Sequence, residues 1–168
     1  MPVKQSILVL IAFLGLCFAA AFIGSLFRPG EWYRSLAKPR WTPPDSVFAP
    51  VWTVLYAMMA VAAWLVWQEL GLVAAGFPLV VFVGQLGLNV LWSYLFFGMH
   101  RPDLALGGIV ALWLAIVMTL VSFWVVRPFA GVLLVPYALW VAFAGALNHA
   151  IWRLNRPAVL PSGREENR

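Results

Sequence analysis

Residues 30–56 read GEWYRSLAKPRWTPPDSVFAPVWTVLY, and this stretch decides how the rest of the chain is interpreted. It gathers bulky aromatic side chains on a backbone stiffened by prolines: Trp32, Tyr33, Trp41, Trp52 and Tyr56, with Pro39, Pro43, Pro44 and Pro50. Such a composition argues against a disordered linker, and long loops in compact domains are usually functional. We predict a structured lid over a cavity between membrane helices, which runs into the second of those helices.

The composition indicates an integral membrane protein. The chain has 168 residues, of which 64% are hydrophobic and only 10% are charged, and its mean hydropathy is +0.91. A water-soluble domain requires a far more charged surface. We expect a single transmembrane domain over residues 1–168, because one polytopic unit leaves little room for a second domain. The one cysteine, Cys17, permits no disulfide within the chain.

Long apolar runs predict an all-α bundle of five transmembrane helices. About 20 apolar residues in a helix cross the ~30 Å of hydrocarbon in a bilayer, which places the spans at 6–27, 47–68, 78–97, 103–126 and 129–153, with a polar tail over 154–168. A cleaved signal peptide is the alternative for the first span, although that apolar run is longer than the usual signal core. Pro136 predicts a kink in the fifth span.

The cations predict the orientation in the membrane. With five spans, Lys4 and Arg127 share the N-terminal side, and the opposite side carries Arg28, Arg34, Lys38, Arg40, Arg101, Arg153, Arg156, Arg164 and Arg168. The positive-inside rule then puts the N-terminus outside and the C-terminus in the cytoplasm. Because the cations sit beside apolar spans, the net charge of +5 indicates orientation and not a nucleic-acid partner.

The acidic residues exclude several classes of function. None of them falls in the middle of a predicted span: Glu31, Asp45, Glu69, Asp103, Glu165 and Glu166. Proton-coupled transporters usually keep an ionisable relay there, so an ion-driven pump is not expected. The chain carries no Gly-rich phosphate loop, no paired carboxylates and no Ser/His/Asp set. His100 and His149 alone do not make a metal site, and we expect no metal and no cofactor.

Polar and aromatic residues in the apolar spans are candidates for a site. Gln85 and Asn89 either lock two helices together by a hydrogen bond or orient a ligand in an apolar pocket. Asn148 is expected to be structural. Core packing explains any one of Trp52, Tyr56, Trp92 and Trp140. Together with the aromatic first loop on the same side, they favour a cavity for a flat, apolar ligand.

Three blocks resemble the translocator protein family, also called the tryptophan-rich sensory proteins or TspO family. They are the stretch quoted above with its KPRWTPP core, GQLGLNVLWSYLFFGMHRP at 84–102, and VPYALWVAFAGALNHAIWRLN at 135–155. They occur in order and cover nearly the whole chain. The resemblance implies a five-helix bundle, commonly a homodimer, with a pocket beneath the first loop. Family members bind porphyrins such as protoporphyrin IX, and some bind cholesterol and synthetic benzodiazepine-site ligands.

The resemblance also implies which residues bind and what they do. Porphyrin transport, stress sensing and light-dependent porphyrin breakdown have all been proposed for the family. A receptor, sensor or carrier for porphyrins is therefore one expectation, and a light-dependent porphyrin-degrading enzyme with Trp52 and Trp140 as catalytic residues is the alternative. The ligand-binding residues carried over by motif are Tyr33, Trp41, Phe48, Trp52, Tyr56, Asn89, Trp92, Phe96, Trp140 and Ala144.

Two positions depart from the family pattern. Ser46 stands where the family usually has a tryptophan, which removes one aromatic side chain from the lid or the pocket rim. His149 stands where the sterol-recognition pattern needs a tyrosine, which argues against a sterol as partner, although contact with membrane lipid is expected. The short tail and the lack of a targeting peptide are typical of a multi-pass protein of a bacterial cell membrane.

Overall fold

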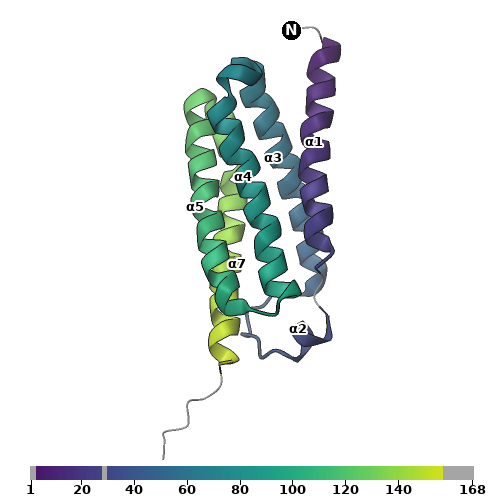
Figure 1. The fold of residues 1–168 in the computed structure, drawn as a ribbon, viewed down its shortest axis with the longest axis vertical. Coiled ribbons are helices and arrows are strands. Elements are labelled where there is room, and N and C mark those ends of the chain that lie inside the picture. Colours follow the sequence, from purple (N-terminus) through teal and green to yellow (C-terminus); the bar gives the residue numbers. More distant parts are fainter. Residues whose placement is uncertain (1–2, 28–29, 157–168) are drawn as a thin grey trace, which may run out of the picture.

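The computed structural model describes residues 3–27 and 30–156, and within them the chain is an all-α bundle without a strand. Five helical segments of this part are long and apolar enough to span a membrane, which confirms the predicted fold class. In chain order (Figure 1) the elements are α1 Val3–Ser25, α2 Glu31–Ser35, α3 Asp45–Ala74, α4 Gly76–Ser93, the π-helix η1 Tyr94–Gly98, α5 Pro102–Val126, α6 Pro128–Val132 and α7 Val135–Leu154.

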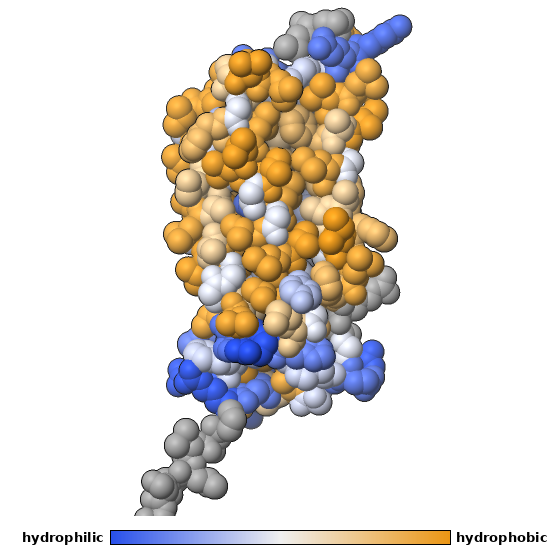
Figure 2. Space-filling view, in the orientation of Figure 1, coloured by the Kyte–Doolittle hydropathy of each residue, from blue (hydrophilic) through white to orange (hydrophobic). Residues whose placement is uncertain are grey.

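The long helices run side by side, and their ends define two faces of the molecule. Helix α1 packs on α3 and α4, and α5 packs on α4 and α7. The start of α1 and the end of α7 lie at opposite ends of the bundle (Figure 1). The short α2 lies across the end at which α7 finishes. On the face drawn in Figure 2, apolar side chains cover the middle of the bundle, and hydrophilic ones gather mainly at the end with α2.

The second span is longer than predicted. Helix α3 begins at Asp45 and continues to Ala74, whereas the sequence predicts a span over 47–68. The path of this helix changes in a sharp break at Gly71, with φ 69° and ψ 178°. A side chain is disfavoured at that positive φ, so glycine permits the break. A further helical turn follows, and α4 starts at Gly76.

The third span ends in a π-helical turn that the sequence does not indicate. The backbone N–H of Met99 donates to the carbonyl of Tyr94 at 2.8 Å, and that of Arg101 donates to the carbonyl of Leu95 at 3.1 Å. A Cβ on Gly98 would lie 2.9 Å from Tyr94 Cδ2, so a larger residue at the close of this turn would force the Tyr94 ring to shift. Such π-helical turns are frequent at functional sites, and this one presents its phenylalanines to the lid.

The fifth span is interrupted where a kink was expected. The sequence predicts one bent helix over 129–153, but α6 ends at Val132 and α7 starts at Val135, with Pro136 in its first turn. A proline ring clashes with the carbonyl four residues earlier and lacks the N–H that would bond to it. For Pro136 that carbonyl belongs to Val132, so the helix stops there and restarts.

Candidate ligand-binding cavity

A cavity of about 420 Å³ lies among α1, α3, α4 and α7, beneath α2. This volume is within the range of small-molecule sites, and an apolar wall with a few polar groups is typical of them. The structure brings eight of the ten expected binding residues to this one cavity: Tyr33, Phe48, Trp52, Tyr56, Asn89, Trp92, Trp140 and Ala144. The cavity therefore joins residues from all three motif blocks.

Two expected residues lie elsewhere. Phe96 is 3% exposed and lines a separate pocket of about 30 Å³ behind the main cavity, where its ring meets Tyr33 at 6.2 Å between centroids. Trp41 is 49% exposed and packs edge-on against Phe143 on α7, with ring centroids 5.6 Å apart. Phe96 thus supports the wall from behind, and Trp41 fastens the first loop outside the cavity.

The sequence did not identify the wall that α1 contributes. Apolar and small side chains at the end of α1 line the cavity, namely Phe18, Ala21 and Gly24. In sequence they look like any lipid-facing residues, because no aromatic cluster or polar group marks them. Other unpredicted lining residues come from the lid side and the wall: Ser25, Phe27, Asp45, Ala49, Thr53, Ser93 and Phe97.

The first loop, residues 30–44, forms a lid over the cavity, and aromatic contacts hold it. Within the lid, Trp32 stacks on the His100 ring with centroids 4.4 Å apart. His100 holds a positive φ of 56° in the α4–α5 connection. Tyr33 is 4% exposed and packs edge-on against Phe97 at 5.5 Å. Lys38 Nζ lies 4.1 Å from the centroid of the Tyr33 ring, a cation–π contact.

The end of α7 holds the lid by hydrogen bonds. The backbone N–H of Ala37 donates to Asn155 Oδ1 at 3.0 Å, and Asn155 Nδ2 donates back to the Ala37 carbonyl at 2.9 Å. A side-chain amide that bonds both polar groups of one residue fixes the position and the orientation of that segment. The last motif residue, Asn155, therefore anchors the lid to the end of α7.

A chain of buried hydrogen bonds crosses the bundle from the cavity. The hydroxyl of Tyr56 donates to Asn89 Oδ1 at 3.0 Å, and Asn89 Nδ2 donates to the Tyr137 hydroxyl at 3.0 Å. Tyr137 then donates to Gln85 Oε1 at 2.8 Å, and Gln85 Nε2 approaches Met59 Sδ at 3.6 Å. Gln85 is thus a structural link between helices. Asn89 also links helices, and it lines the cavity.

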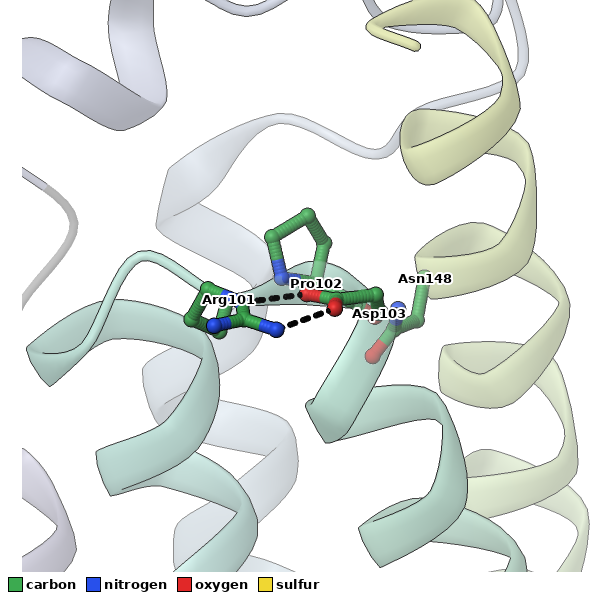
Figure 3. A network of polar contacts seen from close by, with 4 residues as sticks. All are labelled: Arg101, Pro102, Asp103 and Asn148. Carbon is green, nitrogen blue, oxygen red and sulfur yellow. Dashed lines mark hydrogen bonds and ion pairs between the residues drawn. The ribbon is translucent and has the colours of Figure 1, made fainter.

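Asn148 has a structural role, as expected. Trp92 Nε1 donates to Asn148 Oδ1 at 3.1 Å, and Asn148 Nδ2 donates to the carbonyl of Pro102 at 2.8 Å. Figure 3 shows Asn148 beside the start of α5, where Arg101 and Asp103 form a two-bond ion pair with distances of 2.8 and 2.6 Å. These contacts fix the first turn of α5 and orient the Trp92 ring against the cavity.

Two polar features of the wall bear on ligand binding. Trp140 Nε1 is buried and has no hydrogen-bond partner among the described residues. Asp45 lines the same cavity near Tyr33. Burial raises the pKa of the Tyr33 phenol, and the negative charge of Asp45 raises it further. The wall therefore includes an indole whose buried N–H is unpaired and one carboxylate, together with the Asn89 amide and the hydroxyls of Thr53 and Ser93.

This arrangement defines a class of protein, a polytopic membrane protein with an apolar, aromatic cavity between its helices and a structured loop over that cavity. The TspO/MBR family model matches residues 13–153, and the chain belongs to that family. It is 45% identical over 159 residues to the tryptophan-rich protein TspO of Chlorobaculum tepidum, covering 90% of this chain and 99% of that one. The translocator protein of Homo sapiens is 42% identical over 139 residues, covering 80% and 82% of the two chains. Membership in this family supports a membrane receptor or sensor role.

Proposed function

We propose that the chain is a membrane receptor, sensor or carrier that binds porphyrins of the protoporphyrin IX type and related planar apolar ligands. The observation that carries this proposal is the cavity of about 420 Å³ with Trp52, Tyr56 and Trp140 in its wall. Aromatic side chains stack well on planar rings.

Titration with protoporphyrin IX tests the proposal. The purified protein in mild detergent is followed by the porphyrin absorbance and by quenching of tryptophan fluorescence. Trp52→Ala is expected to weaken binding about tenfold, since ring stacking is worth on the order of 1–3 kcal/mol and 1.4 kcal/mol is one decade. Trp124→Ala is the control, because Trp124 is 48% exposed and does not line the cavity. Equal affinities in both variants would reject the site.

A light-dependent degradation of the bound porphyrin is the second candidate. It is favoured by one observation: Trp52 and Trp140, the two residues that would act on the porphyrin, line the same cavity. Illumination of the complex would then change the porphyrin spectrum irreversibly, and Trp52→Ala would lose the change. A bound porphyrin that survives illumination unaltered would leave only the binding function.

We further propose a homodimer in a bacterial cell membrane, with the N-terminus outside and the C-terminus cytoplasmic. Small residues permit close contact between helices in membranes, and the exposed face of α1 includes Gly15. A sterol is not proposed as a ligand, because His149 replaces the required tyrosine and its ring lies 5.8 Å from that of Trp152, outside the cavity. A strictly monomeric mass in several mild detergents would contradict the dimer.

A further inference from the structure

The cavity wall carries one charged side chain among the described residues, and that side chain is Asp45. Every other lining group is aliphatic, aromatic, a hydroxyl or an amide. Asp45 is the first residue of α3, at the lid end of the cavity. Asp45 is exposed at this end, so its charge acts at the rim of the cavity, on ligand substituents that come close to it, and salt screens it over longer distances. The sign of this charge therefore matters for any ligand with ionised substituents.

No cation of the described chain neutralises Asp45. The three ion pairs in residues 3–27 and 30–156 join Arg34 to Glu31, Arg101 to Asp103 and Arg127 to Glu69. Among the lid cations, Arg34 is thus paired within α2 and Lys38 rests on the Tyr33 ring. Neither they nor Arg40 line the cavity. The basic lid therefore does not present its charge to the cavity interior.

Asp45 also has a structural role at the start of α3, which is distinct from its effect on a ligand. A carboxylate in the first turn of a helix is stabilised by the helix dipole. The N-cap residue of α3 is Pro44, and the carboxylate of Asp45 makes no hydrogen bond among the described residues. The carboxylate oxygens of Asp45 therefore accept no hydrogen bond from the helix backbone. The helix dipole stabilises the ionised carboxylate, so its negative charge remains at the wall of the cavity.

We propose that Asp45 sets the charge selectivity of the cavity, so that planar ligands with amine-bearing or uncharged substituents bind better than the same ring with free carboxylates. This inference rests on the proposed porphyrin-type function and specifies its ligand class. A carboxylate side chain on the ligand meets a like charge at the lid end, which disfavours binding. A protonated amine meets an opposite charge there and makes a charge-assisted hydrogen bond.

Three ligands that share one macrocycle test the inference: protoporphyrin IX, its dimethyl ester, and a diamide of the same ring whose two side chains end in primary amines. Their affinities are measured by porphyrin absorbance on the full chain in a neutral detergent. The wild-type protein is expected to bind the diamine best and the diacid worst. Asp45→Asn is expected to reduce the diamine-to-diacid affinity ratio about tenfold and to leave the ester unchanged, whereas Asp45→Glu keeps the ratio.

Asp103→Asn is the matched control. Asp103 is also an acid in the first turn of a long helix and is on the lid side of the bundle, but it pairs with Arg101 and does not line the cavity. Its substitution is expected to leave the ratio as in the wild type. A general charge effect of the protein surface would instead change the ratio equally in both variants.

The outcomes separate the two claims. The inference is wrong, and the proposed function stands, if the ester binds and one of two results is found. Either Asp45→Asn leaves the diamine-to-diacid affinity ratio unchanged, or Asp103→Asn changes that ratio as much as Asp45→Asn does. If the wild-type protein binds none of the three porphyrins, the proposed function fails and the inference fails with it. A diamine-to-diacid affinity ratio that falls in Asp45→Asn but not in Asp103→Asn supports both the inference and the proposed function.

Discussion

At the scale of single residues, the Tyr137 hydroxyl is central to the buried hydrogen-bond chain, because it accepts from Asn89 and donates to Gln85. Tyr137→Phe would leave both amides without this partner inside the bundle. Each unsatisfied buried group costs about 1–3 kcal/mol, so we expect a clearly lower thermal midpoint in detergent. Tyr94→Phe is the control, since Tyr94 is 43% exposed. Equal thermal midpoints for the two variants would show that the buried hydrogen-bond chain contributes no stability.

The sequence predicted some of these residues and not others, for physical reasons. An amide in an apolar span must find a hydrogen-bond partner, so the sequence identified Gln85 and Asn89 as candidates for a specific role. Tyr137 stands near the start of α7, where a tyrosine resembles an interfacial anchor, so its burial at 1% exposure was not anticipated. The position of Asp45 at the cavity could not be predicted, because sequence does not reveal which side of a first turn faces a cavity.

At the scale of elements, the lid is held by few contacts that a mutation can remove. Asn155→Ala deletes both bonds to Ala37. Each such bond contributes about 0.5–1.5 kcal/mol, so we expect bound porphyrin to dissociate several-fold faster in a stopped-flow displacement experiment. Asn155→Asp keeps the acceptor for the Ala37 N–H but loses the donor, and an intermediate rate is expected. Unchanged dissociation in both variants would mean that the lid does not limit release.

The junction of α5 and α6 has no room for a side chain at Gly131. A Cβ there would lie 2.8 Å from Trp124 Cβ and 2.9 Å from Trp124 Cα, which is backbone and cannot move aside easily. Overpacking costs about 1–3 kcal/mol, so Gly131→Ala is expected to lower the thermal midpoint. Gly107→Ala on α5 meets nothing within 4 Å and is expected to be neutral or stabilising. A Gly131→Ala protein as stable as the Gly107→Ala protein would contradict this account.

Hydrophobicity predicted the five spans because crossing a bilayer requires about 20 apolar residues, whatever their packing. It could not predict where backbone geometry changes inside an apolar run. The residues of the π-helical turn at 94–98 and those around the interruption after Val132 are themselves mostly apolar. In each case a close contact or a proline ring decides the local path, and neither alters mean hydropathy.

At the scale of the whole molecule, the cavity and the lid lie at one end of the bundle, and this asymmetry depends on α1. Only Cys17 and Ala20 of α1 are buried, so most of the helix faces outward. Its last turns nevertheless close the cavity through Ala21 and Gly24. Small residues there leave space between α1 and α3, which elsewhere pack together. The same apolar helix thus serves as lipid-facing surface and as cavity wall, a division that hydropathy alone does not reveal.

The charges at the two ends of the bundle predict that the lid faces the cytoplasm. Among the described residues, the end away from the lid carries Lys4 and Arg127, and the lid end carries Arg34, Lys38, Arg40, Arg101, Arg153 and Arg156. Positive charge is retained on the cytoplasmic side. Single cysteines at Val73, which is 97% exposed near the end of α3, and at Ser35 on the lid test this with a membrane-impermeant maleimide.

Intact cells are expected to label Val73→Cys from outside, and Ser35→Cys is expected to react only after lysis. The native Cys17 is 0% exposed and supplies an internal background control. Labelling of both positions in intact cells would contradict the five-span arrangement, because the two sites would then share one side. Labelling of Ser35→Cys alone would keep the five spans but reverse the orientation, so that the lid and its cavity would open to the outside.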